Sequence, residues 1–324
     1  MPILEVRGLS VCYASENGDV RAVDRVSLTL EEGEFLGIVG ESGCGKSTLL
    51  FAIAQILSPP CEIVGGSVIF RGRDLVQLGE RQLRHMRWRD FSVVMQSAMN
   101  ALNPVLTIGE QLADTIAAHD PMPRRQAAER GAEVMRLVGI DPIHLKSYPH
   151  QLSGGMRQRA MIAMALLFTP QLVIMDEPTS ALDVVAQRSL MVQIRELQRK
   201  LGFAVIFVTH DMSLVSNFTD RVAVMYAGQV VELSQTRELF KQPKHPYSVG
   251  LMDAFPSILG ARQTLQGIPG SPPDLIRPPR GCRFHPRCPK AMAICVEEAP
   301  GLLEVDTASV RCHLYSEVPR AASA

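Results

Sequence analysis

The sequence predicts an α/β fold with a mixed sheet, and two kinds of short strand indicate it. Residues 3–11 and 26–30 alternate apolar and polar side chains, as half-buried antiparallel strands do. The continuous apolar runs at 35–39, 172–175 and 204–208 have the length of buried parallel strands and are followed by polar residues or glycine. Because ligands bind beyond the carboxyl ends of parallel strands, a site is expected at these three ends.

Helical patterns and a change of composition divide the chain further. Residues 108–168 are mostly helical in pattern and predict a helical subdomain inserted between two parts of the core. A further apolar stripe at helical spacing predicts a helix packed on the sheet: Leu190, Ile194, Leu197 and Leu201. Prolines and glycines then accumulate. We expect a first domain over 1–255, with the subdomain at about 97–168, and a loop-rich domain over 256–324 that core burial alone would not hold together.

Composition excludes several classes of protein. The chain has 324 residues, of which 46% are apolar and 20% charged, as in ordinary globular proteins. Lys and Arg together number 33, as do Asp and Glu, so the basic excess that usually accompanies nucleic-acid binding is missing. No run approaches the ~20 apolar residues of a membrane-spanning helix, and the N-terminus lacks a secretory signal pattern. We therefore expect a cytosolic chain that reaches a membrane only by docking to other subunits.

A phosphate-binding motif follows the apolar run at 35–39. The segment GESGCGKS fits the pattern G-x-x-x-x-G-K-[ST] and precedes a helical run, which is the context that the motif requires. Its glycines allow the backbone N–H groups to turn inward around phosphate oxygens, and the following helix adds its positive end. Lys46 is expected to reach the β- and γ-phosphates, and Ser47 to bind Mg²⁺. The residues expected to line the nucleotide are Gly40, Ser42, Gly43, Cys44, Gly45, Lys46, Ser47 and Thr48.

Two carboxylates end the strand predicted at 172–175. Asp176 is placed to bind in the Mg²⁺ shell, and Glu177 lies one residue further, where it can act as general base toward the attacking water. A strand that ends in Asp-Glu is by itself a weak signal. Together with the phosphate-binding motif it predicts a nucleotide-hydrolysing site.

The segment LSGGMRQR at 152–159 resembles the signature motif of ABC ATPases. In that family the serine and glycines bind the γ-phosphate of an ATP held by the opposite subunit, which implies this role for Ser153, Gly154 and Gly155. Ser153 can cap a helix, and the glycines allow the backbone to approach a phosphate closely. Met156 stands where many ABC ATPases have Gln, and this departure resembles the oligopeptide/dipeptide importer branch.

The other motifs of that family are present in order. Gln96 resembles the glutamine that senses Mg²⁺ and the permease, and Asp183 matches the loop that crosses the dimer interface. His210 matches the switch histidine that contacts the γ-phosphate. Tyr13 lies where the family stacks an aromatic ring on adenine, although a place in the core is an alternative. The resemblance implies a P-loop NTPase core of the ABC ATPase type that binds ATP and Mg²⁺, with Glu177, His210 and Gln96 as its catalytic residues.

The C-terminal part resembles the extension of di- and oligopeptide importer ATPases. KHPY at 244–247 and GCRFHPRCPKAMAIC at 281–295 carry this resemblance. In related proteins such a tail holds a [4Fe-4S] cluster, which implies four ligands: Cys282, Cys288, Cys295 and Cys312. The spacing C-x5-C-x6-C-x16-C differs from the paired pattern of common zinc ribbons. Zinc, with His285 or His313 as further ligands, and free thiols remain as alternatives.

The resemblance implies an engine for import of di- or oligopeptides at the cytoplasmic face of the membrane. Two ATP molecules would lie between this chain and a second ABC ATPase, with a sister chain favoured over a second copy. Two transmembrane permeases, and indirectly an extracytoplasmic substrate-binding protein, would complete the system. Glutathione, nickel, opines and oligosaccharides are alternative substrates. Two alternatives come from other classes of protein. One is a soluble ABC ATPase that acts on nucleic acid or ribosomes, and the neutral net charge and the single cassette argue against it. The other is an iron–sulfur redox protein with an attached ATPase.

Overall fold

The computed structural model describes residues 2–16, 18–96, 101–180, 182–254 and 267–316. The predicted domain boundary at 255 and 256 therefore lies outside the described residues. The chain forms two compact units. The first unit comprises Met1–Leu4, Leu30–Phe35 and Ile69–Thr209, and the second comprises Glu5–Thr29, Leu36–Val68 and His210–Ala324.

The first unit contains three adjacent parallel strands, β6 (Phe91–Val94), β7 (Leu172–Asp176) and β8 (Ala204–Val208). Every residue of β7 and β8 is buried, as the continuous apolar runs predict. Phe207 of β8 packs edge-on against Phe35, with ring centroids 6.0 Å apart. The two buried strands predicted here are confirmed, and both end at the edge where Asp176 lies.

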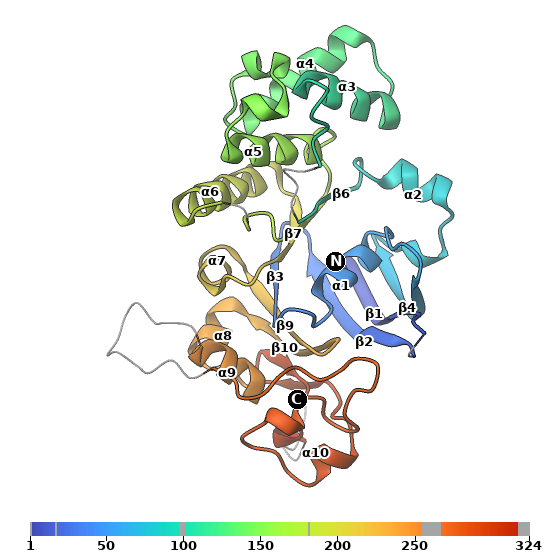
Figure 1. Ribbon diagram of the computed structural model, residues 1–324, viewed down its shortest axis with the longest axis vertical. Coiled ribbons are helices and arrows are strands. Elements are labelled where there is room, and N and C mark those ends of the chain that lie inside the picture. Colours follow the sequence, from blue (N-terminus) through green and yellow to red (C-terminus); the bar gives the residue numbers. More distant parts are fainter. Residues whose placement is uncertain (1, 17, 97–100, 181, 255–266, 317–324) are drawn as a thin grey trace, which may run out of the picture. The chain divides into compact units, whose positions relative to one another are not determined.

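The helices of the first unit begin and end at ordinary helix signals. Thr107 and Glu110 form a capping box at the start of α3. The left-handed Gly202 ends α6, and the buried face of α6 includes Leu190, Ile194 and Leu197. Helices α3, α4 and α5 contact one another and correspond to the predicted helical subdomain (Figure 1). The helices are α2 (Glu80–Met86), α3 (Ile108–His119), α4 (Arg124–Leu137), α5 (Gly154–Ala165) and α6 (Val184–Leu201).

Two groups of strands form the second unit. One group has the order β2-β1-β4 and confirms the strands predicted near the N-terminus. In the other group β3 pairs in parallel with β9, and β9, β10, β12 and β11 then follow as antiparallel neighbours. The bounds are β1 (Pro2–Tyr13), β2 (Val20–Glu31), β3 (Phe35–Val39), β4 (Cys61–Phe70), β9 (Arg221–Tyr226), β10 (Gln229–Gln235), β11 (Leu303–Val305) and β12 (Ala308–Val310).

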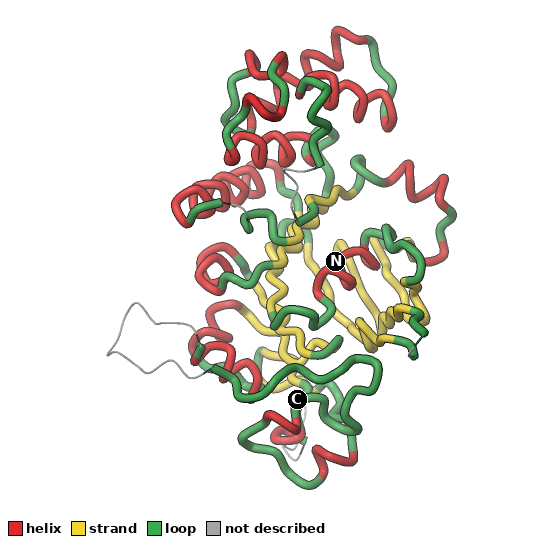
Figure 2. Tube along the Cα trace, in the orientation of Figure 1, coloured by secondary structure: helices red, strands yellow, loops and turns green. Residues whose placement is uncertain are grey.

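The helices of the second unit are short. They are α1 (Lys46–Ile53), α7 (Met212–Phe218), α8 (Thr236–Lys241), α9 (Pro246–Asp253) and α10 (Ile294–Glu297). Among the residues that the structure describes, no helix is both long enough and apolar enough to cross a membrane. The C-terminal segment from residue 267 is mostly loop (Figure 2).

Residues of the C-terminal segment pack into the core of the second unit, on side chains from earlier parts of the chain. Phe284 is 2% exposed and packs edge-on against Tyr226 and Tyr247, with centroids 5.1 and 5.4 Å away. Strand β12 also extends the sheet, with Val310 opposite Glu232. Prolines removed the periodicity from this part of the sequence, but they did not prevent it from burying aromatic and strand residues on an existing core.

Replacing Phe284 by Ala tests this shared core. Phe284→Ala is expected to lower the free energy of unfolding by about 3–5 kcal/mol, because a buried phenyl ring is lost and a cavity remains. Urea unfolding of the full-length chain measures the change. Val296→Ala is the control in the same segment, since Val296 is 50% exposed; it should shift stability by no more than about 0.5 kcal/mol. Equal effects of the two substitutions would contradict the packing described above.

Candidate functional site

The predicted phosphate loop connects β3 to α1 in the second unit, and its glycines are required by close backbone contacts. Gly45 has φ +99°, and a Cβ there would lie 2.0 Å from the carbonyl oxygen of Ala22. Gly40 has φ +151°, and its Cβ would lie 2.2 Å from the carbonyl oxygen of Met225. Neither position has room for a side chain, so the backbone of the loop lies directly against the backbone of Ala22 and Met225.

Lys46 folds back over this loop. Its Nζ donates to the carbonyl oxygens of Gly40 and Glu41 at 2.8 and 2.9 Å, and the residue is only 8% exposed. Cys44 is buried beside it, and burial raises the pKa of the Cys44 thiol. The ammonium group is therefore already placed over the loop in which a phosphate would bind.

Tyr13 is the last residue of β1, and its side chain contacts the first turn of α1. Its hydroxyl shares a hydrogen bond of 3.0 Å with the hydroxyl of Thr48, and burial raises the pKa of Tyr13. Tyr13 is only partly buried, which does not match the alternative of a core residue. The structure thus brings Tyr13 to the phosphate-loop helix.

The acidic residues at the end of β7 lie in the first unit. Asp176 is 1% exposed, and Glu177 has φ +45°, a left-handed conformation that strains a non-glycine residue. The N–H of Glu177 donates to the carbonyl oxygen of Val208 at 2.9 Å. Its Oε2 accepts a hydrogen bond of 3.0 Å from Nε2 of Gln96. The predicted base and the predicted glutamine are therefore in contact, and a strained backbone directs the carboxylate.

Ser153 and Asp183 both cap helices, also in the first unit. The Ser153 hydroxyl accepts from the N–H of Met156 at 3.3 Å, and Asp183 Oδ1 accepts from the N–H of Ala186 at 2.8 Å. Ser153 is exposed where α5 begins at Gly154, and apart from its chain neighbours and the backbone of its own helix no described residue has an atom within 4 Å of the Cβ position of Gly155. The start of α5 is open to an approaching group.

His210 belongs to the second unit. It is exposed and lies two residues beyond the end of β8. The next residue, Asp211, caps α7 by accepting from the N–H of Ser213 at 2.8 Å, which holds the chain on the C-terminal side of His210.

Four free cysteines gather in the C-terminal segment. The N–H of Cys282 donates to the carbonyl oxygen of Cys295 at 2.9 Å. Burial and then the proximity of Cys282, Cys288 and Cys295 raise the pKa of Cys312 to about 11. None of the four forms a disulfide.

The two histidines of this segment, His285 and His313, each hydrogen-bond to a backbone carbonyl group. His285 Nδ1 is 2.9 Å from the carbonyl oxygen of Cys282, and His313 Nε2 is 2.9 Å from that of Glu298. Within the described ranges, no three His, Cys, Asp or Glu side chains are arranged to hold a single metal ion. Within the described residues, neither a metal group held by the four cysteines nor the mixed Cys/His zinc alternative gains support.

Comparisons with known families divide the chain into two matched parts. The model described as "ABC transporter" matches residues 23–180, and the model described as "Oligopeptide/dipeptide transporter, C-terminal region" matches residues 231–295. The dipeptide transport ATP-binding protein DppD of Caldanaerobacter subterraneus is 42% identical over 97% of this chain and 98% of its own length. The chain belongs to the oligopeptide/dipeptide branch of the ABC transporter ATP-binding proteins.

Further relatives agree with this membership. The oligopeptide transport ATP-binding protein OppD of Salmonella typhimurium is 45% identical over 92% of this chain and 89% of its own length. Among solved structures, the dimeric ATP-binding cassette MJ0796 bound to ADP and Pi has a TM-score of 0.65 at 28% identity, and the alignment covers 72% of this chain and 99% of that one. The predicted ABC ATPase fold is confirmed.

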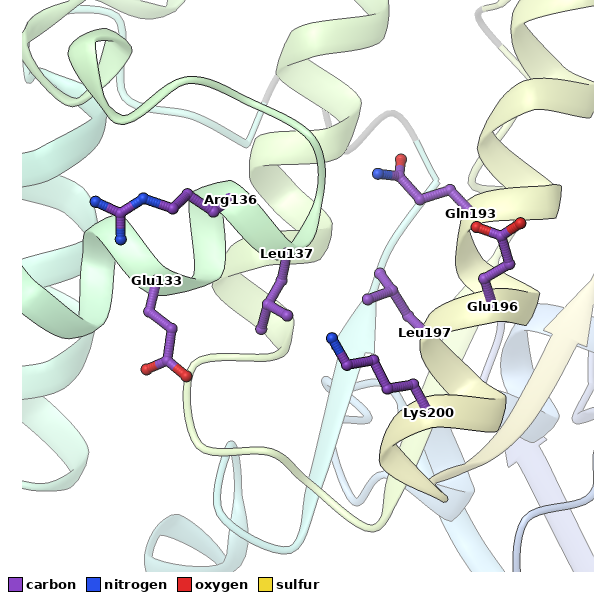
Figure 3. Close-up of a pocket in the computed structure, with 7 residues that line it drawn as sticks. All are labelled: Glu133, Arg136, Leu137, Gln193, Glu196, Leu197 and Lys200. Carbon is purple, nitrogen blue, oxygen red and sulfur yellow. The ribbon is translucent and has the colours of Figure 1, made fainter.

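This ABC family member also has a hollow between α4 and α6 that contains none of the predicted nucleotide residues. Figure 3 shows side chains from the two helices facing each other across it. It has a volume of about 450 Å³ and a mixed lining of two leucines and polar or charged groups: Glu133, Arg136, Leu137, Gln193, Glu196, Leu197 and Lys200.

Sequence reasoning missed Glu41, Tyr247 and Arg287, which meet at the phosphate loop of this ABC protein. The N–H of Glu41 donates to the hydroxyl of Tyr247 at 2.9 Å, and Arg287 donates to the Glu41 carboxylate. Glu41 is an unspecified position of the motif, and the other two lie more than 200 residues away in sequence. The only available signal was that Tyr247 ends KHPY and Arg287 precedes Cys288.

Two glycine substitutions test the constraint on the phosphate loop of the ABC fold. Gly45→Ala is expected to destabilise the chain by about 3 kcal/mol or more, because the methyl group meets a backbone carbonyl that side-chain motion cannot relieve. Gly43→Ala is the matched control: Gly43 also has positive φ, at +76°, but its Cβ position has no atom within 4 Å. Only the conformational strain of about 1–2 kcal/mol is expected there. Thermal unfolding of both variants gives the comparison, and equal losses would contradict it.

Proposed function

We propose that this chain is the ATP-hydrolysing subunit of an ABC importer for di- and oligopeptides. The observation that carries the proposal is that an ABC cassette match and an oligopeptide/dipeptide C-terminal match occupy successive parts of one chain. Relatives named as dipeptide and oligopeptide transport ATP-binding proteins align over nearly its whole length. The chain then works at the cytoplasmic face of the membrane, where it docks on permeases and converts ATP and water to ADP and phosphate.

The phosphate site follows from the groups described above. The loop from Gly40 to Gly45 offers backbone N–H groups to the phosphates, and Lys46 turns from its carbonyl partners to the β- and γ-oxygens. Tyr13 stacks on the adenine. Ser47, Asp176 and Gln96 would hold Mg²⁺, which supplies charge neutralisation on the transferred phosphoryl group.

Hydrolysis is assigned to Glu177, with His210 at the γ-phosphate. The carboxylate of Glu177 takes the proton of the attacking water, and the 3.0 Å hydrogen bond from Gln96 orients it. The left-handed backbone at Glu177 supports this role, since strained residues that are held in place often lie at functional sites.

A second ABC ATPase completes each site. The open start of α5 offers Ser153 and its N–H groups to the γ-phosphate of ATP bound by the partner. Beside Asp183, Val184 and Val185 are 78% and 80% exposed, and such apolar side chains favour an interface. A sister chain is the proposed partner. Two permeases and an extracytoplasmic substrate-binding protein form the rest of the importer.

The four cysteines are proposed to hold a [4Fe-4S] cluster with a structural role. The support is their mutual proximity and their free state. A cluster spreads its thiolate ligands more widely than a single ion does, so the lack of a single-ion arrangement within the described residues is compatible with it. When bound, the cluster would supply cationic iron that stabilises the thiolates of Cys282, Cys288 and Cys312, whose burial otherwise raises their pKa.

Glu177→Gln tests the hydrolytic mechanism. The variant is expected to bind MgATP normally but to hydrolyse it about 10²–10⁴-fold more slowly, because the amide cannot accept the proton of water. Binding is measured with a fluorescent ATP analogue and hydrolysis by phosphate release from the assembled transporter. Lys46→Ala is the control that should lose nucleotide binding itself. Undiminished hydrolysis in Glu177→Gln would remove Glu177 from the role of base.

The metal content of the C-terminal segment tests the cluster. Anaerobically purified full-length chain is expected to contain about four iron and four sulfide per chain and to absorb visible light. Cys288→Ser should lose this absorption, whereas Cys12→Ser, outside the segment, should keep it. Stoichiometric zinc, or no metal, would contradict the cluster while leaving the ATPase assignment intact.

A further inference from the structure

The phosphate loop is held from outside by a residue of the C-terminal segment. Arg287 Nη1 and Nη2 donate to the two carboxylate oxygens of Glu41 at 2.7 and 3.0 Å. The Arg287 side chain is 6% exposed and that of Glu41 is 26% exposed. A bidentate pair of this kind fixes both distance and orientation, and its low exposure limits screening by salt.

Arg287 is itself held firmly. Its Nε donates to the carbonyl oxygen of Pro269 at 2.8 Å, and its guanidinium carbon lies 5.8 Å from the centre of the Tyr226 ring. Nη2 also donates to the carbonyl oxygen of Ile268, at 3.3 Å. Because most of its donors have partners, the guanidinium is a fixed anchor rather than a mobile surface charge.

A turn between two cysteines sets the position of Arg287. The N–H of His285 donates to the carbonyl oxygen of Cys282 at 3.1 Å, and that of Cys288 donates to the carbonyl oxygen of His285 at 3.2 Å. Phe284 of the same turn lies in the aromatic cluster with Tyr226. The turn thus presents Arg287 to the loop from a packed base.

Glu41 connects this anchor to the phosphate-binding groups. Its carbonyl oxygen accepts from Lys46 Nζ at 2.9 Å, while its N–H donates to Tyr247, which is fully buried. Burial raises the pKa of Tyr247, so the hydroxyl stays neutral as a hydrogen-bond partner. The backbone of one loop residue is therefore tied to Lys46 and Tyr247, and its side chain to Arg287.

The negative charge of Glu41 gives the Glu41–Arg287 pair an electrostatic role at the phosphate loop. A carboxylate in a loop that binds a polyphosphate opposes the ligand unless a cation neutralises it. Arg287 supplies that cation from the side of the C-terminal segment. The pair also fixes the loop before the nucleotide arrives, so less ordering remains to be done on binding.

We propose that Arg287 is a positioning residue of the nucleotide site, which neutralises Glu41 and holds the phosphate loop ready for ATP. The inference rests on the proposed function and deepens it. It makes the C-terminal segment, through Arg287 and Tyr247, a working part of the phosphate site and not only a docking or metal-holding appendage.

The test is a double-mutant cycle on the affinity of the full-length chain for a fluorescent ATP analogue with Mg²⁺. Arg287→Gln is expected to weaken binding about tenfold, which corresponds to about 1.4 kcal/mol, because Glu41 is left uncompensated beside the phosphates. Glu41→Gln should weaken it about threefold, since the loop loses its anchor but also a repulsive charge. The double variant should resemble Glu41→Gln and so recover part of the affinity. Arg280→Gln, an exposed arginine of the same segment, is the matched control and should bind as wild type.

Each result supports or overturns the inference. Unchanged affinity in Arg287→Gln, or strictly additive losses in the double variant, would overturn it, because two residues that act on ATP binding through each other must give coupled effects. If Arg287→Gln does not fold, Arg287→Lys and Glu41→Gln decide the matter. Arg287→Lys keeps the charge without the bidentate geometry and should weaken binding about threefold, and wild-type affinity in both variants would overturn the inference. Failure of wild-type chain to bind MgATP would instead refute the proposed function.

Discussion

The close approach of the phosphate-loop backbone to its neighbours is the constraint on which the second unit depends. At Gly40 and Gly45 a single methyl group would overlap carbonyl oxygens of Met225 and Ala22. The loop conformation is therefore determined by β2 and β9 on either side of it, and the N–H of Gly228 closes the contact by donating to the carbonyl oxygen of Cys44 at 2.9 Å. A motif of eight residues needs a large part of the unit to hold its shape, which explains why it works only in its strand–loop–helix context.

The C-terminal segment takes part in the same constraint through buried polar contacts. Arg283 pairs with Asp24 at 2.7 Å, and both side chains are less than 10% exposed. A buried ion pair is compatible with folding only when its remaining groups are satisfied, and here Gln229 also donates to Asp24 at 2.9 Å. His245 is 1% exposed, and burial lowers its pKa to about 3; its Nδ1 accepts from the N–H of Tyr247 at 3.0 Å. The contact with His245 helps to orient Tyr247, whose hydroxyl accepts from the N–H of Glu41.

Local chemistry decided which features could be predicted from the sequence. The buried strands before Gly40 and Asp176 were predictable because continuous apolar runs have few other solutions, and Ser153 was predictable as a helix cap because its pattern is local. The sequence did not predict three other strands, β9, β10 and β12, because their residues are buried by partners distant in sequence. The packing of Phe284 could not be predicted for the same reason: prolines concealed the periodicity, while the burial arises from Tyr226 and Tyr247, about 60 and 40 residues away.

The polar contacts of the site also divide into features that a local motif predicts and features that depend on residues distant in sequence. Glu177 was identified from its place after a strand, but its strained backbone and its hydrogen bond from Gln96 depend on geometry that spacing does not contain. Glu41 was passed over because a motif names only the residues whose chemistry is needed in every protein that uses it. The remaining positions adapt the motif to one architecture, and here Glu41 adapts it to a C-terminal segment that provides an arginine. The chemistry of phosphate binding can thus be predicted from a local motif, whereas the support that holds the loop in place comes from residues distant in sequence and requires the folded chain.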